Sequence, residues 1–313
     1  MSLLRTSLLA AALALLAPDR AHAFCGATSC NRADSTQHCA FDAHQCETSG
    51  FPLSWASSCV TFNVQKDAAA SEGIDYDAFG GAVERAFAAW SDARCENGAA
   101  PSLDVHVTGA AVCDTSEYNP TQGNANIVMF REESWPYAGS EDALGITRLR
   151  FDPDTGELWD ADIEINAVEG DFSVGNPVTA VDLDSVLTHE AGHALGLAHT
   201  TVMGATMRAG YTNDDSMRTL EQDDIDGICA IYPPGRVAAT SSCEPRHGFS
   251  ELCAVDQPEP EPEPEAKKPA KDGGCTVTAT GAASPSSWAA ALLGAAALLG
   301  FLARRRRFSA SRR

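Results

Sequence analysis

Three histidines and one glutamate lie within the segment 189–199, which reads HEAGHALGLAH. At about 3.6 residues per turn, His189 and His193 are one helical turn apart and face the same way, so their neutral imidazoles can bind one metal ion. Glu190 follows the first histidine and points to the side of that ion, where a carboxylate can act as a base on a bound water. The alternative is a histidine pair without a metal.

Gly196 and His199 make the metal interpretation more specific. A straight helix cannot carry His199 back to the ion, because it lies six residues beyond His193. Gly196 is where the chain can turn, since glycine adopts left-handed conformations at little cost and often ends helices. Three protein ligands leave a fourth position for water, which is typical of a catalytic zinc site. Burying three histidines together without a metal would be costly.

The pattern HExxHxxGxxH with a following methionine resembles the metzincin metalloproteases. Met207, eight residues past His199 in GATMRAGY, has the spacing of the matrixin branch. The resemblance implies that Met207 floors the zinc site; Met203 competes for this role at a shorter spacing. It also implies that Tyr211 walls the pocket for the substrate side chain after the scissile bond. Ala209 stands where matrixins have proline.

The segment TLEQDDIDGICAIYPP is similar to the closing helix of matrixins. Asp223 and Asp224 occupy the paired-aspartate positions of that family. Acidic residues near a helix N-terminus also favour the helix on their own account. We therefore expect structural and supporting roles for both rather than a catalytic one.

Short apolar patterns predict the elements that must position this site. CVTFNV alternates as a half-buried strand does, and LDVHVTG, NANIVMFRE, ITRLRFD and DADIEIN predict further strands. A helix with one apolar face is predicted between the first two strands, its stripe being Phe79, Val83, Phe87 and Trp90. The matrixin resemblance covers residues 51–236 and implies an α+β, zincin-like metzincin domain, with a twisted mixed sheet of about five strands and three main helices.

Other metals are less strongly indicated. Many matrixins hold a second, structural zinc through histidines before the active-site helix, but between Cys46 and His189 this chain offers only His106. We therefore expect one catalytic zinc and no structural one. Asp152 and Asp154 in FDPDTGELWDADIEIN have the oxygen ligands that calcium prefers. A hairpin turn at DPDTG is the favoured alternative.

The N-terminal residues 1–23 combine an early arginine, an apolar run and a small-x-small end, as a secretory signal peptide does, with cleavage before Phe24.

Export allows cysteines to pair. An even number of cysteines in the exported body suits five disulfides, of undetermined connectivity, and no CxxC spacing supports metal binding instead. The prosegment motif that silences many matrixins is missing. A cysteine of segment 24–50 could replace it, but disulfides are the favoured use. The cysteines of the exported body are at positions 25, 30, 39, 46, 59, 95, 113, 229, 243 and 253.

The protease domain is flanked by the cysteine-rich segment 24–50 before it and by the extension 237–253 after it. Beyond that extension the composition changes twice. In residues 254–274 alternating proline and glutamate prevent a packed core, so we expect a stalk. Residues 275–313 contain an apolar helix at 286–303 and an arginine cluster. A plain membrane anchor is one interpretation. The tail also resembles the MYXO-CTERM sorting tails of bacterial surface proteins, which implies processing at Cys275.

The formal net charge of −21 argues against a nucleic-acid partner. We therefore expect a monomeric zinc endopeptidase, exported or attached to the cell surface through its tail, that hydrolyses internal peptide bonds of extracellular proteins or peptides. The resemblance implies that substrate lies extended beside the ALGITRLRF strand. A catalytically silent adhesion or binding module is the alternative, which the intact Glu190 argues against. For a zinc hydrolase of non-peptide bonds the sequence offers no positive sign.

Overall fold

The structure is a computed structural model that describes residues 23–32, 34–116 and 118–255. The predicted stalk, apart from its first two residues, and the predicted tail lie outside the described residues, as does the predicted signal peptide apart from Ala23. Within the described part of the chain, no helix is long and apolar enough to cross a membrane.

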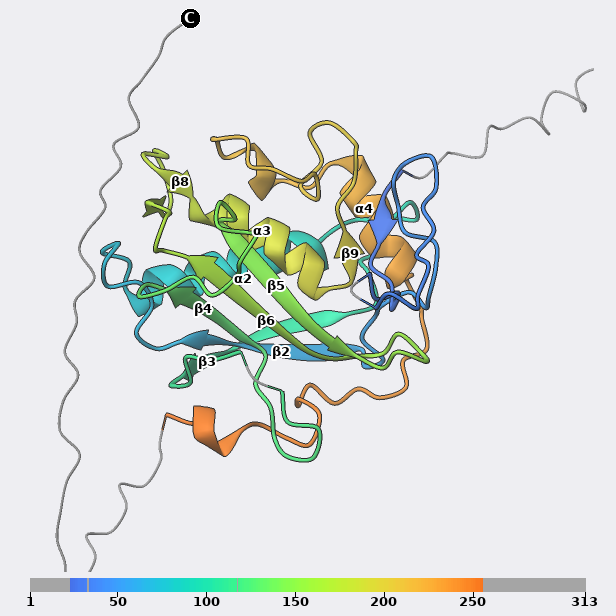
Figure 1. Ribbon diagram of the computed structural model, residues 1–313, viewed down its shortest axis with the longest axis horizontal. Helices are drawn as coiled ribbons and strands as arrows, with labels where there is room; N and C mark the ends of the chain where they lie inside the picture. Colours follow the sequence, from blue (N-terminus) through green and yellow to red (C-terminus); the bar gives the residue numbers. More distant parts are fainter. Residues whose placement is uncertain (1–22, 33, 117, 256–313) are drawn as a thin grey trace, which may run out of the picture. The chain divides into compact units, whose positions relative to one another are not determined.

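A five-stranded mixed sheet forms the centre of the domain (Figure 1). Its strand order is β3-β2-β4-β6-β5, and all neighbours are parallel except β5, which runs antiparallel to β6 at the edge. This confirms the predicted mixed sheet and places the ITRLRFD strand at its edge. The strands are β2 (Cys59–Gln65), β3 (Asp104–Ala111), β4 (Ile127–Arg131), β5 (Gly145–Phe151) and β6 (Leu158–Asn166).

Three helices complete the α+β domain, as predicted. They are α2 (Tyr76–Ser91), α3 (Leu183–Ala194) and α4 (Gln222–Ile231). The predicted apolar stripe of α2 is fully buried. It packs with α3 and with alternate residues of β2, β4 and β6, so both helices cover one face of the sheet.

Short elements join the helices and the sheet. Strand β1 (Cys25–Gly26) pairs antiparallel with β9 (Leu197–Ala198), and β7 (Phe172–Ser173) pairs parallel with β8 (Val181–Asp182). Two 3-10 helices, η1 (Ser216–Arg218) and η2 (Glu251–Cys253), follow later in the chain. The β1–β9 pair brings the N-terminal segment directly beside the chain that carries His199 (Figure 1).

Five disulfides connect the described cysteines, as the even count predicted. Cys59–Cys243 and Cys113–Cys253 tie the C-terminal extension to the domain. That extension contributes to a small second core on the other side of the sheet, formed by Ala111, Ala125, Ile127, Met129 and Cys253. The remaining pairs are Cys25–Cys46, Cys30–Cys39 and Cys95–Cys229.

Candidate active site

Helix α3 is held at both ends by polar groups from other elements. At its start, the Asp182 side chain accepts a hydrogen bond from the backbone N–H of Ser185 at 3.0 Å and from Arg218 Nε at 2.7 Å. At its end, the carbonyls of Ala194 and Leu195 cannot bond within the helix. Trp55 Nε1 donates to the former at 2.9 Å, and the Tyr232 hydroxyl donates to the latter at 3.0 Å.

Gly196 turns the chain directly after the helix. Its φ is +95°, in the left-handed region, and a Cβ there would lie 2.4 Å from the Leu53 carbonyl oxygen. Only glycine fits both the conformation and the space. The chain then forms β9 and returns His199 towards the helix, as the spacing predicted.

The three histidines converge on one point. The Nε2 atoms of His189 and His193 lie 3.1 and 3.2 Å from Nε2 of His199. Nitrogen ligands at 2.0–2.1 Å from a tetrahedral zinc lie about 3.3 Å apart, so the spacing suits one zinc ion. His189 is buried, His193 half-buried and His199 exposed, which leaves one side of the cluster open.

Backbone carbonyls fix which ring nitrogen carries the proton. Nδ1 of His189 lies 2.7 Å from the Thr206 carbonyl oxygen, and Nδ1 of His193 lies 2.9 Å from that of Leu197. A carbonyl only accepts, so each Nδ1 donates, and in a neutral ring Nε2 then presents a lone pair. Lone pairs brought together in this way repel each other unless a cation binds them. The donor set therefore fits a zinc ion.

Desolvation favours the neutral form of two of the histidines. It lowers the pKa of His199 to about 4, and the proximity of His189 acts in the same direction. The pKa of His193 falls well below its usual range for the same reasons. Since only the neutral ring binds a metal, these shifts favour metal binding down to mildly acidic pH.

Glu190 lies beside the histidine cluster with little solvent contact. Its side chain is 5 % exposed, and the Thr147 hydroxyl donates to its Oε2 at 2.7 Å. Burial raises the pKa of Glu190, while the electrostatic influence of the neighbouring His189 and the Thr147 hydrogen bond oppose that rise. A Cβ on Gly145 would lie 2.9 Å from Glu190 Cγ, so the glycine at the start of β5 makes room for this side chain.

Met207 lies beneath α3 in a loop organised by Asp224. The methionine is 1 % exposed, whereas Met203 is 74 % exposed. Both carboxylate oxygens of Asp224 accept backbone N–H groups, from Thr206 at 2.8 Å, Met207 at 3.0 Å and Glu221 at 2.9 Å. Because the Thr206 carbonyl in turn accepts the hydrogen bond from His189 Nδ1, Asp224 supports the position of His189 through the loop.

Tyr211 lines a hollow next to the cluster. Its hydroxyl accepts a hydrogen bond from the backbone N–H of Asp182 at 2.7 Å, and burial raises its pKa. The hollow has a volume of about 260 Å³, and its lining includes Leu144, Val186, Glu190 and Met217. We call it the tyrosine pocket. It can accept an apolar side chain within reach of the histidines.

The sequence profile that matches this chain is that of the matrixin peptidases, over residues 54–233, which is more than half of the chain. The chain belongs to the matrixin family. Metalloendoproteinase 1 of Glycine max is 32 % identical over 162 residues, 50 % of this chain and 46 % of the relative. Neutrophil collagenase of Homo sapiens is 35 % identical over 145 residues, 43 % of this chain and 30 % of the relative. Interstitial collagenase of Bos taurus is 53 % identical over 55 residues, 18 % of this chain and 12 % of the relative. The chain spans less than half the length of each of these relatives.

The structure of this matrixin also shows the surroundings of His106 and Asp152, the residues considered for other metals. His106 lies near Cys59 and Cys243, but those two cysteines are joined in a disulfide. Asp152 lies in the turn of the β5–β6 hairpin, where its side chain accepts the backbone N–H of Asp154 at 2.8 Å. The hairpin turn is thus formed as expected, and calcium at this turn stays an untested alternative.

The cysteines of segment 24–50 are all paired, because Cys25 bonds to Cys46 and Cys30 to Cys39. None of these four offers a thiol to the metal site in this structure. The favoured use of these cysteines, in disulfides, is confirmed.

Sequence reasoning missed several residues that shape the site of this matrixin. Thr147, which holds Glu190, lies 43 positions away and carries no motif of its own. Arg218 holds the start of α3 through Asp182, and only the DLDS capping pattern before the helix hints at a partner. The cleft-facing position of segment 24–50 has no signal in the sequence beyond its cysteines.

Proposed function

We propose that this matrixin is an exported zinc-dependent endopeptidase that hydrolyses internal peptide bonds of extracellular proteins. One observation carries the proposal: three histidine Nε2 atoms converge beside a buried glutamate at the floor of an open cleft. Membership of the matrixin family supports it, as do relatives named as metalloendoproteinases and collagenases.

In this mechanism His189, His193 and His199 would hold the zinc through Nε2. When bound, the zinc would supply Lewis-acid polarisation of the substrate carbonyl and of a water. The hydrogen bonds from Nδ1 to the Thr206 and Leu197 carbonyls keep two of the rings in orientation during turnover.

Glu190 acts as the general base and then as the general acid. Its carboxylate takes a proton from the attacking water and delivers it to the departing amine nitrogen. Thr147 holds Oε2 during both transfers. The raised pKa makes the carboxylate a stronger base than an exposed glutamate, which suits proton abstraction near neutral pH.

The edge strand β5 positions the substrate. Its outer edge has no strand partner among the described residues, so its N–H and C=O groups can pair with an extended peptide. The tyrosine pocket, reached from Gly145 at the start of β5, then receives the side chain after the scissile bond. Met207 supports the histidines from below.

The decisive test measures zinc content and cleavage of a denatured protein mixture, for the wild type and for Glu190→Ala. We expect about one zinc per chain in both proteins and a loss of about 10²- to 10⁴-fold in cleavage rate for the variant. Glu169→Ala, at an exposed glutamate, is the matched control and should cleave normally. If the wild type binds zinc but cleaves nothing, the protease assignment fails and a silent binding module is favoured.

We also propose that the tail attaches the mature protein to the cell surface or releases it after processing at Cys275. The support is the sequence pattern of residues 254–313. Expressing the full chain with Cys275→Ser and following its distribution between cells and medium tests this. An unchanged distribution and an unchanged size of the mature protein would contradict the processing step.

A further inference from the structure

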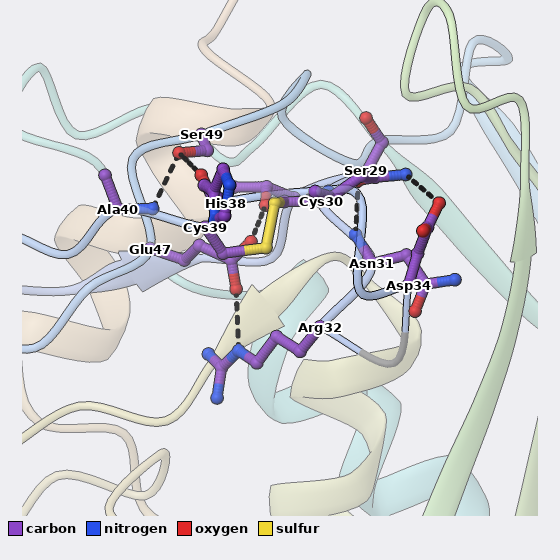
Figure 2. Close-up of a disulfide and its surroundings, with 12 residues drawn as sticks. Ser29, Cys30, Asn31, Arg32, Asp34, His38, Cys39, Ala40, Glu47 and Ser49 are labelled. Carbon is purple, nitrogen blue, oxygen red and sulfur yellow. Dashed lines mark hydrogen bonds and ion pairs between the residues drawn. A yellow bond between two sulfur atoms is a disulfide. The ribbon is translucent and has the colours of Figure 1, made fainter.

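Segment 24–50 forms one side of the active-site cleft, and we call it the N-terminal wall. Strand β1 pairs with β9, and the chain continues beside Gly196, whose carbonyl accepts the Ala27 N–H at 2.8 Å. Figure 2 shows the Cys30–Cys39 disulfide of the wall with its surroundings. The second disulfide, Cys25–Cys46, anchors the wall at β1. The wall is therefore attached to the chain segment that carries His199.

The hollow between the wall and the catalytic residues has a volume of about 860 Å³, and we call it the wall pocket. From the wall it is lined by Arg32, Phe41 and Glu47 among others, and from the opposite side by β5 and the metal-site residues. A second hollow of about 540 Å³, the outer pocket, continues along β5 past Thr147, Leu149 and Phe151. Arg32 lines both pockets, so it lies where they meet.

Arg32 is held in place but keeps hydrogen-bond donors available. Its Nε donates to Glu47 Oε2 at 2.9 Å, and its guanidinium lies 4.6 Å from the centre of the Phe41 ring (Figure 2 shows the ion pair). Glu47 also accepts from the Thr28 hydroxyl at 2.9 Å and is 10 % exposed, so it is fixed by the wall. The Arg32 side chain is 67 % exposed. A guanidinium has five N–H donors, and the ion pair uses only one of them.

Charge makes this arginine distinctive. Among the described residues that line the two pockets, Arg32 is the only lysine or arginine, in a chain of net charge −21. Of the acidic residues in the wall pocket, Glu47 is already paired and Glu190 is buried. An approaching substrate therefore meets one exposed positive group on this side of the cleft.

We propose that Arg32 is a specificity-determining residue that favours substrates with Asp or Glu on the N-terminal side of the scissile bond. The proposal rests on the proposed function, which assigns the tyrosine pocket to the side chain after that bond. Because the tyrosine pocket at Gly145 receives the side chain after the scissile bond, the residues before that bond lie on the other side of the histidines, beside Thr147 and Leu149, in a peptide antiparallel to β5. An extended peptide advances about 3.3 Å per residue, so Arg32 lies beside a position about two to four residues before the bond. A carboxylate there can pair with the free guanidinium donors.

The test uses fluorogenic peptides that are identical except for Glu, Ala or Lys at each of the second, third and fourth positions before the cleaved bond. We expect kcat/KM to be about fivefold higher for Glu than for Lys at one of these positions, because attraction and repulsion at an exposed site each contribute modestly. Arg32→Glu should invert that preference, and Arg32→Lys should retain part of it. The preference should weaken in 1 M salt, where the screening length is about 3 Å.

Two controls make the result specific. Arg94→Glu changes the charge equally at an exposed arginine just beyond α2 and outside both pockets, so it should leave the preference unchanged. Glu47→Gln removes the competing carboxylate and should strengthen the preference for Glu peptides. If the wild type shows no preference for Glu over Lys peptides, or if Arg32→Glu and Arg94→Glu alter that preference equally, Arg32 does not determine the substrate specificity.

A binding measurement separates this proposal from the proposed function. Fluorescence anisotropy of the same labelled peptides with Glu190→Ala should show the same ratio of Kd values. If no peptide is cleaved by the wild type yet this binding ratio depends on Arg32, the protease assignment fails and the recognition site stands. If peptides are cleaved but neither kcat/KM nor Kd depends on Arg32, the recognition site fails alone.

Discussion

The two sides of the cleft are built by different means. Helix α3 is buried along almost its whole length, and its ends are bonded to Trp55, Tyr232 and Arg218 from distant parts of the chain. The N-terminal wall has an exposed stretch at residues 35–38 and two disulfides within it. Packing and hydrogen bonds thus hold His189, His193 and Glu190, whereas the wall depends on short stretches of backbone pairing and on cross-links.

This difference separates two demands on the molecule. A metal site must be kept within a fraction of an ångström, which a close-packed core with satisfied polar groups can do. A recognition surface needs only a stable backbone that carries exposed side chains such as Arg32, whose positions need not be fixed as closely. We therefore expect changes in the core to affect zinc binding and overall stability, and changes in the wall to affect recognition. The predictions below test this separation.

Asp224→Ala should produce the largest effect on the core side. Three backbone N–H groups lose a buried charged acceptor, and one of the residues involved, Thr206, bonds to His189. We expect the free energy of unfolding to fall by about 3–5 kcal/mol, and zinc affinity to fall with it. Urea denaturation and chelator competition measure the two effects.

Asp226→Ala on the same helix is the control for that change. Its carboxylate accepts from the Gln222 side chain at the surface, so the free energy of unfolding should change by less than about 1 kcal/mol. A similarly small change for Asp224→Ala would show that the loop beneath the histidines does not depend on the Asp224 carboxylate. Hydrogen bonds would then not be what holds the core side of the cleft.

Removing the Cys30–Cys39 bond with a pair of serine substitutions should affect the wall alone. The chain-entropy model gives about 2–3 kcal/mol for a loop of this size, in which the cysteines are 9 residues apart. We expect hydrogen exchange to accelerate in residues 31–45, with the amides of α3 unchanged. Loss of protection in α3 to the same extent would mean that the two sides are one cooperative unit.

A pair of glycines compares the packing of the two sides directly. A Cβ on Gly192 in α3 would lie 2.3 Å from Met207 Sδ and 2.6 Å from Trp90 Cζ2, whereas one on Gly26 in β1 would meet nothing within 4 Å. Overpacking costs about 1–3 kcal/mol, and contacts as short as these place the cost in the upper part of that range, above the gain of about 1 kcal/mol in helix propensity. Thermal unfolding should therefore show Gly192→Ala as destabilised by about 1–2 kcal/mol.

Gly26→Ala should stay within about 0.5 kcal/mol of the wild type, as is usual for a substitution that makes no new contact. Equal effects at the two positions would contradict the difference in packing between the two sides.

The sequence predicted the core side well because its signals are local. The spacing of His189, His193 and His199 together with Gly196 contains the geometry of the helix and its turn, and the apolar stripe of α2 identified the face that packs on α3. The five strands were each visible as short apolar patterns.

The wall could not be predicted, because nothing local in segment 24–50 says where it lies. Its position depends on the β1–β9 pairing and on Ala27 bonding to Gly196, contacts that span about half of the chain. The same holds for Thr147 and Glu190, which are 43 residues apart, and for Arg218 and Asp182, 36 apart. Cysteine counting gave the number of disulfides but not their pairing, because pairing is set by the fold.

A further prediction concerns the pH dependence of stability, and we expect this effect to be confined to the core side. Asp160 on β6 is 1 % exposed, and its Oδ1 has no hydrogen-bond partner within the described residues. Burial raises its pKa to about 9; nearby Asp162 adds to this, and Arg150 opposes it. Between the ordinary value of 3.8 and about 9, the folded state keeps a proton that the unfolded chain has released. Stability therefore falls as pH rises through this window.

We expect the wild type to lose unfolding free energy between pH 5 and pH 8, at up to about 1.4 kcal/mol per pH unit for the one proton that the folded state keeps. Asp160→Asn should lose markedly less, because its amide cannot release a proton. Asp104→Asn, at an exposed aspartate of β3, should follow the wild-type pH profile. Denaturant titrations at several pH values measure this slope, and hydrogen exchange reports the opening of residues 31–45 at the same pH values. If hydrogen exchange in residues 31–45 changed with pH in parallel with the free energy of unfolding, the buried carboxylates would affect both sides of the cleft. The two sides would then differ in packing but share the same electrostatic effect.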